Sequence, residues 1–410
     1  MHRFKASMSH INMHPISPAN TPPASNESLP APQTTDTRRA KRDQPVLTTE
    51  QKARNAINNA LTYTTSLDGY TLHSVVGFGA NGVVIAAEQH TPQGASIPVA
   101  IKIIYKPNNS PKQPSTASDP TPNEILTLRA IARASNRQQH PTLLRYISDH
   151  QDAFHFYLVT ELFGSDWLAL VRSVLNIHGQ KTNSQSLPPL VHRGKGVTLR
   201  FSNGSADLWA WSYFERCANW DPATGETAGL PGHLVKKIIG DVCSGLHHLH
   251  ALGMYHGDIK SENILVTAVN KDSLTSEVQV GGAQGDYHIE VRICDFGHTE
   301  SRSTGVRNVG TLDHAPPEYS KSAVQQGVFV DGAKADVYAL GLMATRLLAS
   351  SGMFSEMVVD MDNMLGMVRD GVIEGMSELE LVDDLLTGML CDEPEARFSM
   401  EQVLTHPWFD

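Results

Sequence analysis

The stretch HGDIKSEN at residues 256–263, followed by the apolar residues 264–266, determines how this sequence is interpreted. It places a carboxylate at Asp258, an ammonium group at Lys260 and an amide at Asn263. A carboxylate can accept the proton of a hydroxyl group, a lysine can stabilise a phosphate in transfer, and an asparagine can bind a metal ion. Three such functions beside an apolar strand have no good packing explanation, because charged residues are rarely buried without a partner. We therefore predict a phosphoryl-transfer site.

Downstream, the sequence ICDFG at residues 293–297 again places a carboxylate after an apolar strand. Asp295 is followed by Phe-Gly, which predicts a flexible turn, and a carboxylate at such a turn suits a Mg²⁺ ligand. The tripeptide alone is common by chance. Its position shortly after residues 256–263 makes it part of the same predicted site.

Upstream, the sequence GFGANG at residues 77–82 has the spacing G-x-G-x-x-G. Glycines at this spacing let backbone N–H groups approach phosphates where any Cβ would clash, although a glycine-rich hairpin turn would look the same. The surrounding residues 70–88 alternate and are β-branched, which predicts strand, turn and strand. A Rossmann-type dinucleotide site needs a helix after the turn, so the pattern favours a hairpin that covers a nucleotide.

A lysine at residue 102 ends the sequence VAIK, within a predicted strand over residues 97–105. A lysine in such a strand needs a partner for its charge. The expected partner is Glu124, because apolar residues at helical spacing predict a helix over residues 124–134. Alone, either residue would be a surface charge, so both assignments depend on the other motifs.

The chain divides into a polar tail, a small β-rich part and a mostly helical part. Residues 1–45 are rich in Pro, Ser, Thr and Asn, which predicts disorder. A further strand is expected over 154–162, and helices are expected over 234–252, 337–349 and 379–390. Two segments look irregular, at 173–230 and 268–287. The first contains an aromatic block between residues 209 and 220, which suggests that it docks onto the body of the protein.

Composition excludes some classes of protein. The formal net charge is −10, with 33 Lys and Arg against 43 Asp and Glu, which argues against a broad basic surface for nucleic acid. The four cysteines do not form a disulfide framework. No apolar run approaches the length of a membrane span. We expect a cytoplasmic or nuclear protein, or one found in both, with neither nucleic acid nor membrane as a partner.

Further motifs follow in the order GT at 310–311, APPE at 315–318, Asp336 and Arg397. With the motifs above, they resemble the eukaryotic protein kinase family, serine/threonine type. The resemblance covers roughly residues 68–409. It implies an α+β bilobal fold with a five-stranded N-lobe carrying one helix, a mostly helical C-lobe, and ATP in the cleft. The expected division is a disordered tail over 1–66 and a kinase domain over 67–410, with the N-lobe at about 67–161, the C-lobe at about 165–410 and insertions at about 173–230 and 268–287.

The resemblance also implies roles for individual residues. Asp258 is the expected catalytic base, Lys260 stabilises the transferring phosphoryl group, and Lys102 pairs with Glu124 and holds phosphates. Asn263 and Asp295 are the expected Mg²⁺ ligands. The expected ATP-binding residues are Val76, Gly77, Phe78, Gly79, Ala80, Asn81, Gly82, Val84, Ala100, Lys102, Thr160, Glu161, Phe163 and Asp166, the last placed near the ribose. Glu318 and Arg397 resemble the family's structural ion pair.

Serine/threonine preference rests on Lys260 and Thr311, and the expected partner is a protein with a Ser or Thr acceptor. Three positions depart from the family pattern: Gly257 replaces the usual Arg, Pro316 the usual Ala, and Tyr338 the usual Trp. In relatives that Arg binds an activation-loop phosphate, so its absence suggests activity without that phosphorylation.

Two other interpretations stay open. A His-Gly-Asp sequence also resembles small-molecule phosphotransferases of the aminoglycoside and choline kinase type, although those lack the segment around Thr311 and Arg397. A non-catalytic pseudokinase or scaffold would have lost one of the key polar residues, and all of them are present here.

Overall fold

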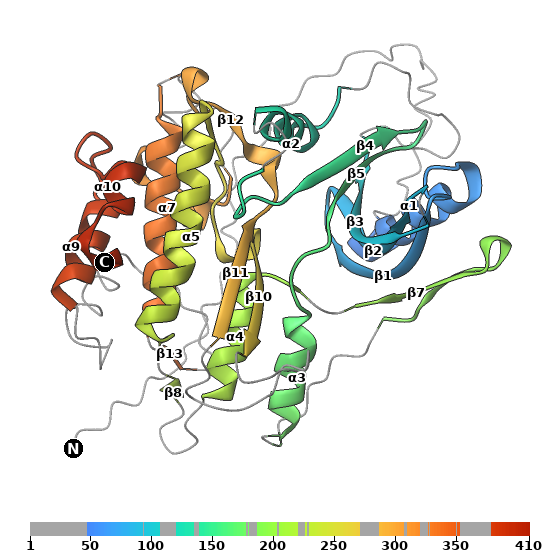
Figure 1. The fold of residues 1–410 in the computed structure, drawn as a ribbon, viewed down its shortest axis with the longest axis horizontal. Helices are drawn as coiled ribbons and strands as arrows, with labels where there is room; N and C mark the ends of the chain where they lie inside the picture. The colour runs from blue at the N-terminus through green and yellow to red at the C-terminus, as the bar shows by residue number, and fades with distance from the viewer. Residues whose placement is uncertain are drawn as a thin grey trace, which may run out of the picture. The chain divides into compact units, whose positions relative to one another are not determined.

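In the computed structural model the described residues are 47–410, except for residues 93, 107–119, 135–138, 178, 180–186, 203–204, 220–225, 228, 271–286, 307–309, 320–326, 328, 350 and 353–378. These residues form a β-rich N-lobe and a mostly helical C-lobe (Figure 1). The predicted α+β bilobal fold is confirmed. Residues 1–46 of the predicted tail lie outside the described residues.

The N-lobe is built on an antiparallel sheet of five strands. The strands are β1 Tyr70–Phe78, β2 Gly82–His90, β3 Ser96–Tyr105, β4 Tyr146–Gln151 and β5 His155–Glu161. Two strands from the first predicted insertion, β6 Leu190–His192 and β7 Val197–Phe201, extend this sheet to seven strands in the order β4-β5-β3-β2-β1-β7-β6. The predicted number of five strands in the N-lobe sheet is therefore too low.

Alternation along β3 separates the two faces of the sheet. Val99, Ile101 and Ile103 are fully buried in one hydrophobic core, together with residues of β1, β2 and β7. Ala100 and Lys102 point to the opposite face because successive side chains of a strand alternate. The sheet thus turns its apolar face to one core and its functional face toward the cleft.

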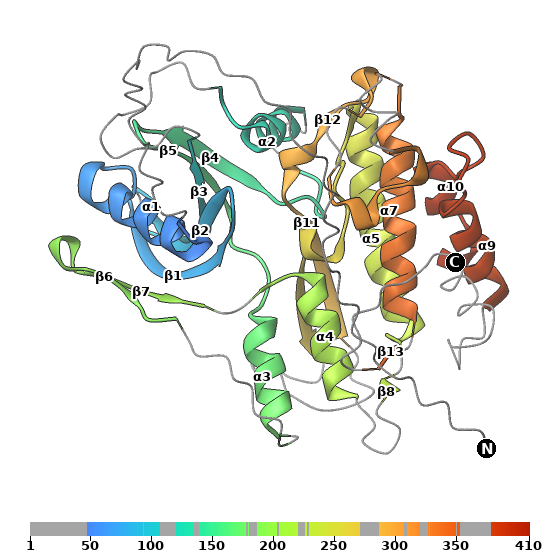
Figure 2. The ribbon, with the colours of Figure 1, turned by 180° about the vertical axis from the view of Figure 1, so that it is seen from behind.

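The apolar face is covered by α1 Thr49–Tyr63, which lies across the sheet (Figure 2). Its N-terminus carries a capping box between Thr48 and Gln51. Apolar residues at helical spacing are buried against the sheet: Ala53, Ala56, Ile57, Ala60 and Leu61. The predicted disordered tail is therefore wrong for residues 49–63, and α1 is a helix beyond the one expected in the N-lobe.

The second helix, α2 Asn123–Ala134, was predicted almost to its bounds. Its buried residues Ile125, Leu128 and Ile131 join the large core that continues into the C-lobe. At its first turn, the Nδ2 of Asn123 donates to the carbonyl oxygens of Gly297 at 3.2 Å and Thr299 at 2.5 Å. The helix is thereby docked beside the turn that carries Asp295.

The C-lobe core lies between long helices and a small two-stranded sheet. The helices are α3 Trp167–Ile177, α4 Leu208–Ala218, α5 Gly232–Ala251, α7 Gly332–Leu348, α9 Leu379–Met389 and α10 Met400–Leu404. The strands β10 Ile264–Asn270 and β11 Tyr287–Ile293 form the sheet, and short pairs join β9 Met254–Tyr255 to β12 Glu300–Ser301 and β8 Glu226–Thr227 to β13 Ser351–Gly352. None of the helices in the described residues is long and apolar enough to cross a membrane.

The first predicted insertion is not irregular. It contains the end of α3, the β6–β7 pair, α4 and β8. Trp211 and Phe214 of the aromatic block are buried in the core of the C-lobe, as predicted, whereas Trp209 is exposed and Trp220 lies outside the described residues. Within the second insertion, β10 and β11 extend to residues 270 and 287, and residues 271–286 lie outside the described residues.

Candidate active site

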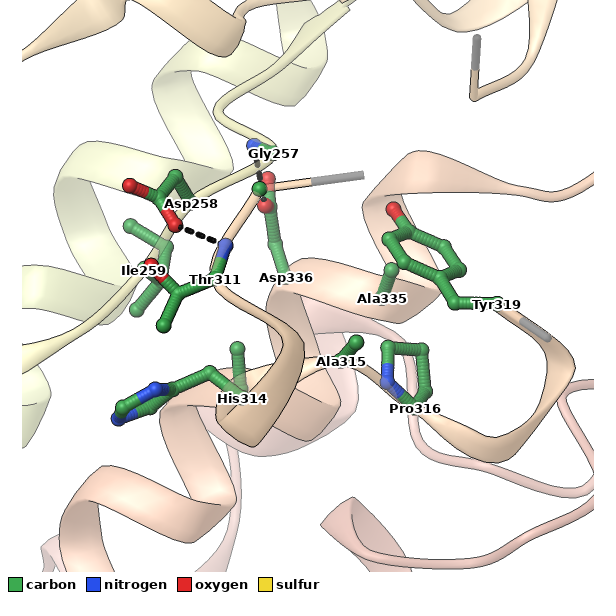
Figure 3. A pocket seen from close by; sticks show the side chains of 12 residues that line it. Gly257, Asp258, Ile259, Thr311, His314, Ala315, Pro316, Tyr319, Ala335 and Asp336 are labelled. Atoms are coloured by element: carbon green, nitrogen blue, oxygen red, sulfur yellow. Dashed lines mark hydrogen bonds between the residues drawn. The ribbon is translucent and has the colours of Figure 1, made fainter. Parts of the chain in front are cut away.

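The side chain of Lys260 and the backbone of Thr311 meet at the carboxylate of Asp258. The Nζ of Lys260 lies 2.9 Å from Oδ2 of Asp258 and donates to Oγ1 of Thr311 at 2.7 Å. The backbone N–H of Thr311 donates to Oδ1 of Asp258 at 2.7 Å (Figure 3). Burial opposes the ionisation of Asp258, but the bonds from Lys260 and Thr311 outweigh it and hold the pKa of Asp258 below its ordinary value. The site therefore presents a carboxylate next to a fixed ammonium group.

Asn263 and Asp295 lie next to this carboxylate. The Nδ2 of Asn263 donates to the carbonyl oxygen and to Oδ2 of Asp258, at 2.7 and 3.0 Å, which leaves the amide oxygen of Asn263 for another partner. The N–H of Cys294 donates to the carbonyl oxygen of Asn263 at 2.9 Å, so Asp295 follows directly from a residue bonded to Asn263. One amide oxygen and one carboxylate are hard donors that suit Mg²⁺, which takes few protein ligands when phosphates supply the rest.

The loop that carries Asp258 is held from within by α7. The carboxylate of Asp336 accepts the backbone N–H groups of His256 at 2.8 Å and Gly257 at 2.9 Å, and it also contacts Nε2 of His250 at 2.9 Å. Asp336 is almost fully buried. A pocket beside this anchor is lined by residues 257–259 of the catalytic loop (residues 256–263), by residues between Gly310 and Tyr319, and by α7 (Figure 3).

Lys102 lies between two carboxylates. Its Nζ donates to both oxygens of Glu124, at 2.8 and 2.6 Å, and lies 3.4 Å from Oδ1 of Asp295. Burial disfavours the charged amine, but the carboxylates of Glu124 and Asp295 outweigh it and raise the pKa of Lys102. Burial likewise opposes the charge of Asp295, and Lys102 lowers its pKa below the ordinary value. The expected contact between Lys102 and Glu124 is therefore present.

The turn at Asp295 has an unusual backbone. Asp295 has φ 59° and ψ 65°, and it is the one non-glycine residue with positive φ among the described residues. Such a conformation persists where the surroundings impose it, and it is frequent at functional sites. Here Phe296, which is fully buried, packs against the ring of His256 with centroids 5.3 Å apart. The carboxylate of Asp295 on the same turn lies 3.4 Å from Nζ of Lys102.

The glycine-rich turn, residues 77–82, joins β1 to β2. Gly79 closes it through a hydrogen bond from its N–H to the carbonyl oxygen of Gly82 at 2.9 Å. A Cβ on Gly82 would lie 2.7 Å from the carbonyl oxygen of Ile103, so this glycine permits the close approach of β2 and β3. A Cβ on Gly77 or Gly79 would meet nothing within 4 Å. Their open side is where a ligand could approach the backbone.

The cleft face of the sheet has two rows of neighbouring side chains. Ala100 pairs with Ala86 on one side and Thr160 on the other, and Lys102 pairs with Val84. The small alanines next to a buried threonine leave room for a flat apolar group above the row, which suits an adenine ring. Val84, Ala100, Lys102 and Thr160 therefore lie together, as expected.

Glu161 and Phe163 lie in the hinge, the segment that joins the two lobes, and their side chains make contacts outside the cleft face. The carboxylate of Glu161 accepts the N–H of Arg145 at 2.9 Å and lies 3.4 Å from Nε of Arg292. The ring of Phe163 lies under the guanidinium of the same Arg292, with 4.3 Å between the Cζ atom and the ring centroid. Both side chains thus contact Arg292 of the C-lobe, and their expected contribution to ATP binding stays a prediction.

Two other expected residues have structural contacts. Asp166 accepts the N–H of Ala169 at 3.1 Å, which caps α3, and it accepts a hydrogen bond from the hydroxyl of Ser202 at 2.6 Å. The ring of Phe78 packs against Phe201, away from the cleft face of the sheet. The expected position of Asp166 near the ribose stays a prediction.

The structural ion pair is present. Arg397 donates to both carboxylate oxygens of Glu318, at 2.7 and 2.9 Å, and to the carbonyl oxygens of Lys334, Cys391 and Asp392. Its side chain is fully buried, and its Cζ lies 4.9 Å from the ring centroid of Tyr338. Tyr338, which replaces the usual Trp, therefore supplies an aromatic face for this arginine.

Phe201 and Ser202 contact the site and were missed from sequence. Their signal was local: residues 190–201, LVHRGKGVTLRF, combine β-branched residues with a glycine-containing turn, which predicts a hairpin. No local pattern indicates that this hairpin pairs with β1.

Comparisons with known proteins agree with this geometry. Residues 213–409 match the family described as Protein kinase domain. Calcium/calmodulin-dependent protein kinase type 1 of Macrobrachium nipponense is 24% identical over 348 residues, which cover 83% of this chain and 75% of that protein. Serine/threonine-protein kinase GRIK1 of Arabidopsis thaliana is 28% identical over 190 residues, and serine/threonine-protein kinase PKZ1 of Phytophthora infestans is 28% identical over 197 residues.

The match extends over 42% of GRIK1 and 46% of PKZ1, so this chain spans less than half of the length of these two relatives. The matched residues 213–409 include the catalytic loop, the turn at Asp295 and the pair between Glu318 and Arg397. The motifs, the bilobal fold and the comparisons agree that residues 213–409 belong to the protein kinase family.

Proposed function

We propose that this chain is an active serine/threonine protein kinase, which transfers the γ-phosphoryl group of ATP to Ser or Thr hydroxyls of a protein. The arrangement of Asp258, Lys260 and Thr311 carries the proposal. Asp258 is fixed by two hydrogen bonds, and Lys260 is held between Asp258 and Thr311. Phosphoryl transfer needs mainly positioning and charge stabilisation, and a prearranged pair of this kind supplies both.

Each residue of the site has a defined task. Asp258 orients the acceptor hydroxyl and accepts its proton, because its lowered pKa keeps it ionised. Lys260 stabilises the charge on the transferring group. Lys102, held by Glu124, binds the phosphates. Asn263 and Asp295 would hold Mg²⁺, which when bound neutralises charge on the phosphate oxygens.

The nucleotide would lie on the cleft face of the N-lobe sheet. Val84, Ala100 and Thr160 form the wall against the adenine. Backbone groups of residues 77–82 approach the phosphates, and Asp166 lies near the ribose. Selection of Ser and Thr acceptors is inferred from Lys260 and Thr311, and the similarity to GRIK1 and PKZ1, both named serine/threonine-protein kinases, supports it.

The test is transfer of labelled γ-phosphate from Mg·ATP to a mixture of basic and acidic proteins, with wild type beside Asp258→Asn. The expected result is label on Ser and Thr, identified by phosphoamino-acid analysis, and its loss in the variant. Label equal in both proteins would disprove the role of Asp258. Nucleotide binding without transfer to any protein would favour a scaffold, and transfer to a small molecule would favour the phosphotransferase interpretation that Gly257 leaves open.

A further inference from the structure

The β6–β7 pair, hereafter the ribbon, is bonded to the strand that carries the glycine-rich turn. β7 pairs in parallel with β1 at Ser74 with Arg200 and at Val75 with Phe201. The N–H of Ser202 then donates to the carbonyl oxygen of Val75 at 2.8 Å. Since β1 ends at Phe78, within residues 77–82, the ribbon is bonded to the strand just before that turn.

The side chain of Phe201 also contacts a residue of the turn, Phe78. Its ring is nearly buried and meets the ring of Phe78 edge to face, with centroids 5.8 Å apart at 85°. The guanidinium of Arg54, from α1, lies 4.3 Å from the centroid of Phe201 and donates to the carbonyl oxygen of Pro188 at 2.5 Å. Phe78 therefore contacts the ring of Phe201, which is itself covered by the guanidinium of Arg54.

The next residues are bonded to the other lobe. The hydroxyl of Ser202 donates to Oδ2 of Asp166 at 2.6 Å. The N–H of Trp167 donates to the carbonyl oxygen of Ser205 at 3.1 Å, and the N–H of Val266 donates to that of Ala206 at 2.8 Å. Ala206 is so close that a Cβ on Gly164, just past the hinge, would lie 2.5 Å from its side chain.

We propose that Phe201 and Ser202 are positioning residues for the nucleotide, one acting through Phe78 on the glycine-rich turn and the other through the carboxylate of Asp166. This inference rests on the proposed function, because it assumes that the cleft binds Mg·ATP. The two residues join the turn above the phosphates to the residues beside the ribose. Without them the turn and Asp166 adopt more orientations, so binding must order them again, and the nucleotide is held less tightly.

The test compares wild type with Ser202→Ala and Phe201→Leu. The control is Val191→Ala, because Val191 lies on the same ribbon but is exposed and away from the turn. Mg·ADP affinity is measured by titration calorimetry, and KM for ATP and kcat by steady-state phosphorylation. Loss of a hydrogen bond to a charged group corresponds to a change of about tenfold or more. We expect Kd for ADP and KM for ATP to rise by about tenfold in Ser202→Ala and to rise in Phe201→Leu as well, with kcat close to wild type and the control unchanged.

Two further variants separate positioning from folding. Ser202→Thr keeps the hydroxyl and should restore the wild-type KM. Ser202→Ala combined with Asp166→Ala should bind ADP no more weakly than Asp166→Ala alone, because both changes remove the same interaction. Unfolding curves without nucleotide check that Phe201→Leu leaves the ribbon folded.

The outcomes are distinct. Wild-type Kd and KM in both Ser202→Ala and Phe201→Leu would overturn this inference and leave the proposed function standing. The same holds for a loss of kcat with unchanged Kd and KM. A wild-type chain that does not bind Mg·ATP would overturn the proposed function, and this inference with it.

Discussion

A β-carbon on Gly257 would lie 2.8 Å from the carbonyl oxygen of His298, and Gly257 has φ +82°. The backbone of the catalytic loop therefore follows a path here that suits glycine. The resemblance to kinases implies an Arg at this position that binds an activation-loop phosphate. In this chain the neighbouring segment is held by other contacts: the hydroxyl of Tyr255 donates to the carbonyl oxygen of Gly305 at 3.0 Å, and the N–H of Val306 donates to that of Val330 at 3.1 Å.

Gly257→Ala should lower stability by about 3 kcal/mol, because the left-handed backbone and the close oxygen both penalise a side chain. Gly94→Ala is the matched control, since Gly94 has the same φ of +82° and meets nothing within 4 Å. It should cost about 1 kcal/mol. Urea unfolding measures both. Equal losses in the two variants would show that the contact with His298 has no effect.

Ile57→Ala tests whether α1 belongs to the folded domain. Ile57 is fully buried against the sheet, so removing its side chain should cost about 2–4 kcal/mol. The exposed neighbour Asn55 offers a control, and Asn55→Ala should change stability by less than about 0.5 kcal/mol. Denaturant unfolding gives both values. If residues 49–63 were disordered, Ile57→Ala would leave the free energy of unfolding unchanged.

The two parts of the molecule differ in how far their sequence predicts them. The catalytic motifs are contiguous, and each keeps a short spacing that local geometry demands, so Asp258, Lys260 and Asn263 could be grouped from the sequence alone. The partner of Lys102 required only one helix to follow its strand. α1 carries a helical signal too, with a capping box and apolar residues at helical spacing. Many of its residues are polar, however, so its composition resembles that of the predicted disordered tail.

The ribbon could not be placed from sequence for a different reason. A hairpin is predicted by its own residues, but its pairing with β1 joins Val75 to Phe201, which are far apart in the chain. Such a pairing depends on where the two lobes meet and leaves no local pattern. The contact between Ser202 and Asp166 follows from that pairing.

Arg397→Lys should cost about 3 kcal/mol of stability, because a lysine cannot replace the planar fork that bonds both oxygens of Glu318. The side chain of Arg397 is fully buried, so the lost bonds leave polar groups without partners. Arg145→Lys is the control. The Nε of Arg145 lies 3.7 Å from Oε2 of Glu161 and the side chain of Arg145 is half exposed, so the loss of this pair should change the free energy of unfolding little. Guanidinium unfolding compares the two, and similar small effects would rule out a structural role for the buried pair.

Acid should weaken the fold partly through His155. Burial lowers the pKa of His155 from 6.5 to about 4, and none of the described residues offers its Nδ1 a hydrogen bond. Below pH 6.5 His155 becomes protonated in the unfolded chain, whereas in the folded chain it stays neutral down to about pH 4. The free energy of unfolding therefore falls as the pH falls through this window, by about 3 kcal/mol for this residue.

His155→Asn should remove this share of the pH dependence. Between pH 6.5 and about 4 the variant should show a shallower slope in the free energy of unfolding, while above about pH 7 the two slopes should coincide. Denaturant titrations at each pH measure this. Parallel curves across the acid window would mean that His155 is protonated in the folded state.

Thr311→Val tests the link between Lys260 and Thr311 during catalysis. Valine keeps the shape and the backbone N–H that donates to Asp258, but it removes the hydroxyl that accepts from Nζ of Lys260 at 2.7 Å. Lys260 then loses one of the two contacts that hold it, and a hydrogen bond to a charged group is worth about 1.5–3 kcal/mol. We expect kcat to fall by about tenfold to a hundredfold, with KM for ATP and the unfolding midpoint close to wild type. Thr311→Ser keeps the hydroxyl and should recover most of the rate. If valine and serine give the same kcat, the hydroxyl of Thr311 has no part in positioning Lys260, and only its backbone bond to Asp258 contributes.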